Sequence, residues 1–163
     1  GQSNNNYTTV QLARYVTTIA NEGNCYDLTL VNEIKNIDGR TVYKSDNVPK
    51  NTVDLTDSQW AVIKQGMRQM VSEHTSPSAL INQINVNVAG KTGTAEEDTT
   101  RPDHALFVSF APYENPEVSV TCVIPHGYTS GNAEELAGMV YAYMYDPDKL
   151  DTLDITGNNQ MSD

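Results

Sequence analysis

Hydrophobic side chains recur at helical spacing in three parts of the chain. The first is residues 8–20, whose apolar residues on one side are Val10, Ala13, Val16 and Ala20. Thr8 or Thr9 can cap the start of a helix here, and Gly23 can end it in a left-handed conformation. The pattern therefore predicts an amphipathic helix that stops just before Gly23.

The same criterion predicts two further helices. One begins at Thr56 or Asp57. Its large apolar side chains form a stripe of Trp60, Ile63, Met67, Met70 and Val71. A stripe of this kind is expected to pack in the core. The other helix begins at Asn132 or Ala133 and runs to about Tyr145.

Alternating apolar and polar residues indicate strands. An Asp38-Gly39 turn between residues 28–37 and 40–43 predicts a β-hairpin. Three later strands are predicted at residues 86–94, 105–111 and 118–124. Because they follow one another with short connections, we expect an antiparallel sheet with helices on both faces. The predicted fold class is α/β (α+β).

The segments between these elements are expected to be irregular. Residues 44–54 are predicted to form a loop, and residues 74–83 to contain no more than a short helical turn. Residues 147–163 are acidic and polar, so we expect them to be disordered. The chain is therefore divided into one domain, residues 1–146, and a tail.

Composition narrows the choice of partners. The chain has 163 residues and a formal net charge of −11, which excludes the basic face that nucleic-acid binding needs. Cys25 and Cys122 are too few for a disulfide framework, although a single bridge between them stays open. The cysteines have no metal-binding spacing with His74, His104 or His126, so no metal or other cofactor is expected. No run is long and apolar enough to span a bilayer.

The most specific chemistry lies in Lys91-Thr92-Gly93-Thr94, at the end of a predicted strand. Thr92 and Thr94 share one face because side chains alternate along a strand, so their hydroxyls can together hold a carboxylate. Gly93 has no side chain and lets a substrate backbone approach closely. Lys91 leaves on the opposite face, but its long stem can bring a positive charge to the same ligand. At the edge of a sheet, such a strand can pair with an extended peptide.

This segment resembles the K-[ST]-G-T strand of class B penicillin-binding proteins. The flanking features are also similar: Gly1-Gln2 and the first helix, Ala95-Glu96-Glu97 after the motif, and a strand ending in Phe110-Ala111-Pro112. The resemblance covers residues 1–146. It implies the fold shared by penicillin-binding proteins and serine β-lactamases, a mostly antiparallel sheet with helices on both faces. It also implies a parent protein that is anchored in the cell membrane and acts outside the cytoplasm.

The resemblance gives each residue of the motif a role. Lys91 would contribute electrostatics and hydrogen bonding to the serine of another family motif, S-x-N. Thr92 and Thr94, with Gly93 between them, would bind the carboxylate of a D-Ala-D-Ala stem peptide or of a β-lactam. The backbone N–H of Thr94 would be one of two oxyanion-hole donors. The parent is then expected to be a peptidoglycan D,D-transpeptidase that acts through a serine acyl-enzyme.

The family's nucleophile motif, S-x-x-K, is not found in this sequence. Ser3-Asn4-Asn5 and Ser45-Asp46-Asn47 satisfy the second motif, S-x-N, but they follow the Gly-Gln segment that this motif precedes in the family. Ser45 also fits an ordinary turn. The chain is therefore interpreted as an incomplete C-terminal portion, inactive alone, whose upstream half supplies the nucleophile. We expect the missing layer to leave apolar surface exposed and to favour self-association.

Two other interpretations stay open. A non-catalytic module could use the same edge strand to bind peptide carboxylates or a protein partner, and an upstream reading frame encoding S-x-x-K would argue against it. A β-lactam sensor or β-lactamase piece fits less well with the Gly-Gln opening and the long hairpin. His104 is a further candidate to flank a cleft, although a capped or half-exposed histidine is the simpler interpretation. Glu96 and Glu97 could act as a carboxylate pair, but a solvated loop explains them equally well.

Overall fold

The structure is a computed structural model that describes residues 6–97 and 99–152. Its longer helices are α1 (Thr9–Ala20), α2 (Asp57–Gln69) and α3 (Ser130–Tyr145). Short helical segments are the π-helical η1 (Met70–His74) and the 3-10 helices η2 (Leu80–Asn82) and η3 (Pro147–Thr152). The strands are β1 (Asn24–Cys25), β2 (Glu33–Lys35), β3 (Thr41–Lys44), β4 (Asn51–Thr52), β5 (Ala89–Ala95), β6 (His104–Ala111) and β7 (Val118–Ile124). The predicted helices and the three later strands are all present.

The centre of the molecule is an antiparallel sheet in the order β5-β6-β7. Strand β7 has the predicted bounds, whereas β5 begins three residues later than predicted, at Ala89 rather than Val86. The reason is that the carbonyl groups just before β5 bond elsewhere. Asn87 O accepts from Tyr113 N at 2.8 Å, and Val88 O accepts from the Arg68 guanidinium at 3.2 Å.

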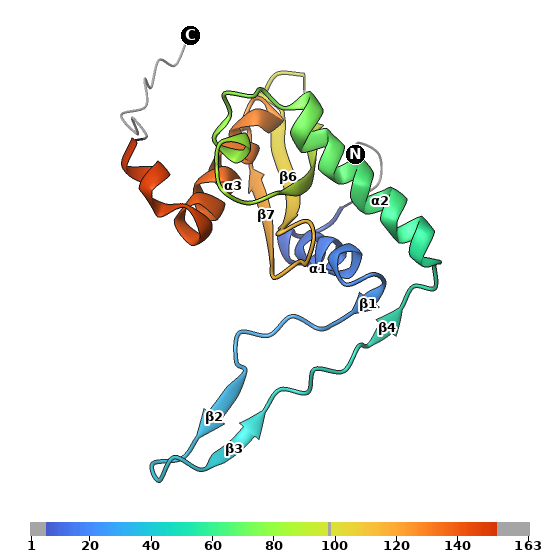
Figure 1. Cartoon of the computed structure of the whole chain (residues 1–163), viewed down its shortest axis with the longest axis vertical. Coiled ribbons are helices and arrows are strands. Elements are labelled where there is room, and N and C mark those ends of the chain that lie inside the picture. Colours follow the sequence, from blue (N-terminus) through green and yellow to red (C-terminus); the bar gives the residue numbers. More distant parts are fainter. Residues whose placement is uncertain (1–5, 98, 153–163) are drawn as a thin grey trace.

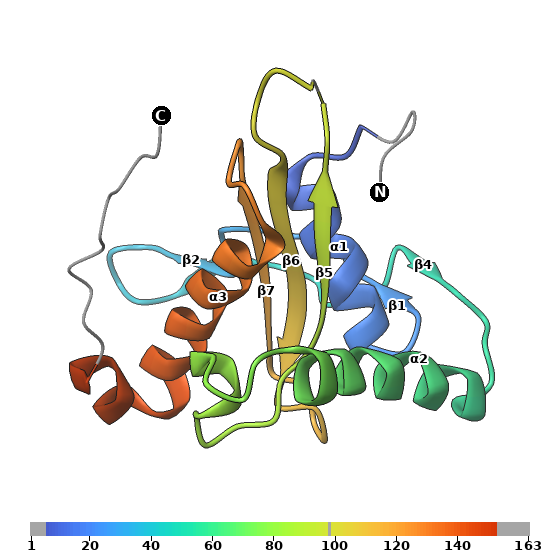
Figure 2. The same ribbon diagram turned by 90° about the horizontal axis from the view of Figure 1, so that it is seen from above.

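Each face of the sheet has its own apolar cluster, because side chains of a strand alternate between faces. On β6, Phe107 packs in the cluster with α3, and Phe110 packs in the cluster with α1 and α2. Both rings are fully buried. Figure 2 shows α3 and α1 on opposite faces of the sheet and α2 across the end where β5 begins. The predicted sheet with helices on both faces is confirmed.

Local sequence explains where the helices start and stop. Thr8 and Thr56 each cap a helix in a reciprocal capping box with the glutamine three residues later. After α1, the left-handed residue that follows the C-cap Asn21 is Glu22, with a φ of +52°, one residue earlier than predicted. Gly23, with a φ of +96°, closes the helix end by donating its N–H to Thr18 O at 2.9 Å. Helix α3 begins at Ser130, two residues earlier than predicted, because Thr129 caps it through the backbone N–H of Gly131.

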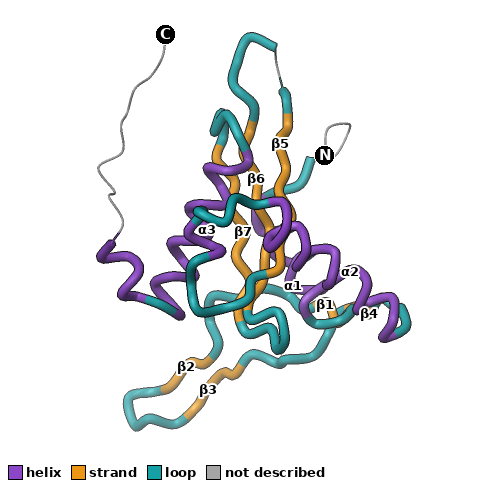
Figure 3. Tube along the Cα trace, turned by 45° about the horizontal axis from the view of Figure 1, so that its top comes forward, coloured by secondary structure: helices purple, strands orange, loops and turns teal. Residues whose placement is uncertain are grey.

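A long arm projects from the body between α1 and α2 (Figures 1 and 3). Its tip is the β2–β3 hairpin, which turns at Asp38-Gly39 as predicted, although its strands are shorter than predicted. Its base is the β1–β4 pair, in which Asn24 lies opposite Thr52. The prediction of an uninterrupted loop over residues 44–54 was therefore wrong. A two-residue strand paired with a distant segment has no local pattern that sequence could show.

The segment after α3 also differs from its prediction. Residues 147–152 form the 3-10 helix η3, and Leu150 packs against the α3 cluster. The contact of Leu150 gives this part of the predicted tail a place on the apolar core. The rest of the predicted tail, residues 153–163, lies outside the described residues, as do Gly1-Gln2 and Ser3.

Candidate functional site

The strand with the Lys-Thr-Gly-Thr motif lies at an edge of the sheet. In the order β5-β6-β7, β5 pairs only with β6, and no described strand borders its other side. Lys91 lies opposite Val108, and Thr94 lies opposite Ala105, so the whole motif is in the regular ladder. The outer side of β5 therefore presents backbone N–H and C=O groups to which an extended peptide can bind.

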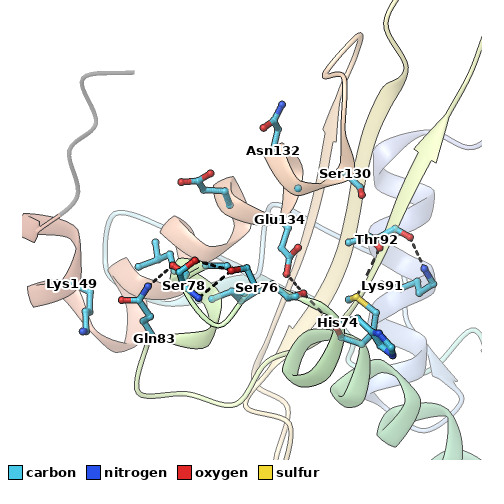
Figure 4. Close-up of a pocket in the computed structure, with 17 residues that line it drawn as sticks. His74, Ser76, Ser78, Gln83, Lys91, Thr92, Ser130, Asn132, Glu134 and Lys149 are labelled. Atoms are coloured by element: carbon cyan, nitrogen blue, oxygen red, sulfur yellow. Dashed lines mark hydrogen bonds between the residues drawn. The ribbon is translucent and has the colours of Figure 1, made fainter. Parts of the chain in front are cut away.

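The side chains of the motif leave the strand on two faces. Thr92 points to the face covered by α3, and its hydroxyl lies 3.9 Å from the Met70 sulfur. Thr94, two residues on, belongs to the same face. Lys91 leaves on the other face, but its Nζ donates a 2.8 Å hydrogen bond to the carbonyl oxygen of Thr92 (Figure 4). This bond brings the ammonium group back to the edge of the strand.

At two glycines of β5, another group can come close to the backbone of the strand. A Cβ on Gly90 would lie 2.5 Å from the Phe107 ring, so only glycine fits between the strand and that ring. A Cβ on Gly93 would meet only the Leu106 Cβ, at an ordinary 3.5 Å. Gly90 is therefore required by packing inside the molecule, whereas Gly93 leaves open space beside the motif.

A cavity of about 950 Å³ lies beside β5, between the sheet, η1, the segment 75–83 and the start of α3 (Figure 4). The residues that give it polar character are Thr92 and Lys91 of β5, His74 and Thr75 near η1, Ser130, Asn132 and Glu134 of α3, and Lys149 of η3. Thr94 does not line it. The cavity therefore meets the motif at its first two residues.

Glu134 is a buried carboxylate at the wall of this cavity, with 7% of its surface exposed. One oxygen, Oε1, accepts a 2.7 Å hydrogen bond from the Thr75 hydroxyl. The two residues are 59 positions apart and are brought together because α3 packs against η2 and the sheet. The same helix anchors the core through Tyr141, whose hydroxyl bonds to Ser109 at 3.0 Å. Burial raises the pKa of Tyr141 above its usual value of 10, with the hydrogen bond to Ser109 opposing this shift.

The loop after the motif is tied back to the sheet by histidines. His104 Nδ1 accepts from the backbone N–H of His126 at 3.1 Å, so the ring proton lies on Nε2 and is donated to Glu97 at 3.0 Å. The two imidazole rings lie 4.9 Å apart. Glu97 thus has a partner in His104, although the side chains of Glu96 and Glu97 are both exposed.

Other residues considered from sequence lie elsewhere. Ser45 follows β3 in the arm and donates its backbone N–H to Asn32 O at 2.8 Å. This bond continues the pairing across the hairpin, so Ser45 does not lie in the predicted turn. Both cysteines are free, and Cys122 is buried. Burial raises the pKa of the Cys122 thiol. Within residues 6–97 and 99–152, no group of three or more potential ligand residues could hold a metal ion.

Sequence reasoning did not single out the cavity residues on α3. A signal for Glu134 was present, however. The buried residues of α3 include Ala137, Gly138, Tyr141 and Ala142, and Glu134 precedes them at the same helical spacing. A carboxylate in the buried stripe of a helix is unusual and marks a position to examine.

A family model described as the penicillin binding protein transpeptidase domain matches residues 1–144. The chain belongs to this transpeptidase family. Among curated proteins, it is 35% identical over 132 residues to penicillin-binding protein 2B of Streptococcus pneumoniae. This match covers 74% of this chain and 19% of that protein. It is 31% identical over 130 residues to the peptidoglycan D,D-transpeptidase PbpA of Mycolicibacterium smegmatis, covering 78% of this chain and 26% of the relative.

Solved structures of penicillin-binding proteins have the same fold. Penicillin-binding protein A from M. tuberculosis, in an imipenem acyl-enzyme complex, superposes with a TM-score of 0.75 at 26% identity. The match covers 88% of this chain and 32% of that chain. The predicted penicillin-binding fold is therefore confirmed. The chain spans about a fifth to a quarter of the length of these curated relatives, at 19% and 26%.

Proposed function

We propose that this chain supplies the substrate-binding strand of a peptidoglycan D,D-transpeptidase. The observation that carries the proposal is the Lys-Thr-Gly-Thr segment on the open edge of β5, beside a cavity that Lys91 and Thr92 line. An extended peptide pairs with β5, and the Thr92 and Thr94 hydroxyls bind its terminal carboxylate. The Lys91 ammonium lies at the same edge and attracts that carboxylate.

The chemistry of the parent enzyme follows from this placement. A serine Oγ attacks the carbonyl carbon of the penultimate D-Ala, a tetrahedral oxyanion forms, and terminal D-Ala leaves with the proton taken from the serine. An amine from a second peptide then attacks the ester carbonyl, the new amide bond forms as the bond to Oγ breaks, and the proton lost by the amine returns to the serine. The backbone N–H of Thr94 is one donor to the oxyanion, and loss of one such donor typically lowers kcat about 10²- to 10³-fold.

The nucleophilic serine comes from the upstream half of the same domain, because no serine of this chain has a lysine three residues later. The chain alone therefore does not form an acyl-enzyme. A protein with this function acts outside the cytoplasmic membrane, and the parent protein carries the membrane anchor. Within the described part of the chain, no helix is long and apolar enough to cross a membrane.

The upstream half of the domain also covers apolar surface that this chain leaves exposed. Strand β7 is the second edge of the sheet, and Leu136, Val140, Tyr143 and Met144 form an exposed apolar stripe on α3. The transpeptidase structure above is matched over only 32% of its length, which leaves ample chain for another strand and helix. Without that half, the same stripe supports self-association of the chain.

The decisive experiment is intact-mass spectrometry after incubation with a fluorescent penicillin, on the chain alone and together with the upstream half. We expect label only in the mixture, on the upstream piece. A covalent adduct on the chain alone would show that the nucleophile is here, and Ser45 and Ser3 would be tested first. No label in either sample, with peptide binding retained, would favour a non-catalytic binding module.

Binding by the strand is measured separately with ¹⁵N-labelled chain and N-acetyl-D-Ala-D-Ala. The expected result is a set of amide shift changes in β5 that Thr92→Val abolishes. The same dipeptide with its carboxylate converted to an amide is the matched control and is expected to leave the spectrum unchanged.

A further inference from the structure

The outer edge of strand β2, in the hairpin at the tip of the arm, is free to pair with another strand. Strand β2 pairs with β3 on one side, and no described strand borders its other side. Figures 1 and 3 show that the hairpin projects away from the central sheet and the helices. A free edge of this kind presents backbone N–H and C=O groups to a partner strand. The proposed role of β5 does not use this edge.

The hydrogen bonds of the hairpin show which residues of β2 face the free edge. Asn32 O accepts from Ser45 N at 2.8 Å, and Asn36 N donates to Arg40 O at 2.9 Å, so both residues bond across the hairpin. Backbone groups alternate in direction along a strand. The even-numbered residues around β2 therefore bond toward β3, and the N–H and C=O groups of the odd-numbered ones point to the free edge.

The two odd-numbered residues of β2, Glu33 and Lys35, carry opposite charges. Their side chains share one face, where Lys35 Nζ lies 3.2 Å from the Glu33 carboxylate. Ile34 points to the other face, beside its cross-strand neighbour Tyr43, and these two residues are 48% and 47% exposed. Lysines commonly protect a free edge from pairing. Here a second copy is not repelled, because an antiparallel strand places each charge opposite the other.

A second copy of the chain fits this edge in one register. When two β2 strands lie antiparallel about a two-fold axis at Ile34, Glu33 of each copy is opposite Lys35 of the other. The outward backbone groups of these residues then meet as hydrogen-bonded pairs, and each pair also joins opposite charges. Ile34 contacts its symmetry equivalent, and Tyr43 extends the apolar stripe on each side.

The distribution of charge along the chain favours contact at the arm over contact at the body. Residues 26–56 contain five acidic and four basic residues, which leaves −10 of the net charge of −11 on the rest of the chain. Two bodies of that charge repel each other. A contact at the tips of the arms keeps the bodies apart, whereas a contact through the exposed stripe of α3 brings them together.

We propose that two copies of this chain associate through β2, which joins their hairpins into one four-stranded antiparallel sheet with a β2 strand of each copy at its centre. The inference goes beyond the proposed function and does not depend on it, because β5 lies in the body and keeps its open edge. Four strands are more stable than an isolated hairpin, which is marginal in water. The contact is short, so the dimer is expected to be weak.

Two single substitutions and their mixture test the pairing. Glu33→Lys makes both outward residues basic, and Lys35→Glu makes both acidic, so each variant alone places like charges opposite each other. The mixture of the two variants places opposite charges at both pairs again. Asp46→Lys, at an exposed position after β3, makes the same charge change as Glu33→Lys outside the paired residues and is the matched control. Each is made with and without Val140→Glu, which blocks association through the α3 stripe.

Sedimentation equilibrium of the full chain, from micromolar to millimolar concentration, measures the association. We expect the otherwise unchanged chain and Asp46→Lys to dimerise, with or without Val140→Glu. Glu33→Lys and Lys35→Glu are each expected to weaken the dimer about ten- to a hundredfold, and their equimolar mixture to restore it. A dimer that persists in both single variants or disappears in Val140→Glu overturns the proposal, as does a chain that stays monomeric throughout.

Amide hydrogen exchange of the unsubstituted chain gives a second readout, which also decides the case in which a substitution unfolds the hairpin. We expect exchange of the Glu33 and Lys35 amides to slow as the concentration rises. The Lys44 amide is the internal control, because Lys44 lies opposite Glu33 and its N–H points to the outer edge of β3. Protection at Lys44 without protection at Glu33 and Lys35 would show that β3 is the paired edge and would overturn the proposal.

Discussion

The arm and the sheet both contain strands predicted from apolar and polar residues, but their apolar side chains differ in burial. In β6, Phe107 and Phe110 are fully buried, each under a different set of helices. In the arm, Leu30 and Ile37 are fully exposed, with relative exposures of 106% and 101%. Alternation of apolar and polar residues therefore predicts a strand, but burial requires a second layer that packs on it.

The physical reason is that two strands cannot make a core. The β2–β3 ribbon has only its own cross-strand contacts and is marginal by itself, whereas β5-β6-β7 has helices on both faces. The arm is connected to the body mainly through β1, β4 and the Arg14–Asp27 ion pair, whose charged atoms are 3.0 Å apart. The stability of the described chain is thus concentrated in the sheet, and four predictions test this.

The largest expected difference is between truncations in the two regions. Phe107→Ala removes a fully buried ring and is expected to lower the free energy of unfolding by about 3–5 kcal/mol. Ile37→Ala at the tip of the arm is expected to change it by less than about 0.5 kcal/mol. Urea unfolding followed by circular dichroism measures both. A cost of several kcal/mol for Ile37→Ala would show that the arm packs on something, in this chain or in a second copy.

An added methyl group is expected to have different effects at the two glycines of β5. Gly90→Ala places a Cβ 2.5 Å from the Phe107 ring and is expected to cost about 1–3 kcal/mol through overpacking. Gly93→Ala meets only a 3.5 Å contact and is expected to have little effect on unfolding. Thermal melts of the two variants make the comparison, and equal melting temperatures would contradict it.

The buried hydroxyl of Tyr141 predicts a dependence of stability on alkaline pH. Burial raises the pKa of Tyr141 in the folded state above its unfolded value near 10. Its contribution to stability is therefore complete below pH 10 and is lost as pH rises toward the folded pKa. Tyr141→Phe is expected to cost about 0.5–1.5 kcal/mol at pH 7 and to reduce the loss of stability above pH 10.

Urea titrations between pH 8 and pH 11 measure this difference. Tyr43→Phe, in the exposed arm, is the control and is expected to keep the wild-type pH dependence. If Tyr141→Phe loses stability above pH 10 as steeply as the wild-type chain, titration of Tyr141 is not the cause of that loss.

The smallest effect is expected at the base of the arm. Asp27 pairs with Arg14 at 3.0 Å, but their side chains are 57% and 36% exposed, so solvent screens the pair. Asp27→Asn is expected to change the free energy of unfolding by less than about 1 kcal/mol, and by less still in 1 M salt. Limited proteolysis measures the local effect, and we expect faster cleavage in the arm with the body unchanged.

Much of the fold could be predicted because its signals are local. Thr56 caps α2, the turn at Glu22-Gly23 ends α1, and the alternation of Val118 to Ile124 placed β7 at its observed bounds. The position of the Lys-Thr-Gly-Thr segment at the end of a strand was also predicted. Errors occurred where partners are distant in sequence, as in the β1–β4 pair.

The sequence alone determined the identity of the helices and strands and the chemical character of the binding strand. Capping hydroxyls, helical spacing and alternation act over a few residues, and so they are visible in the chain itself. The tertiary structure decided that β5 is an edge and that Glu134 meets Thr75 across 59 residues beside it. Those relations arise from packing between separate elements, which no short pattern encodes.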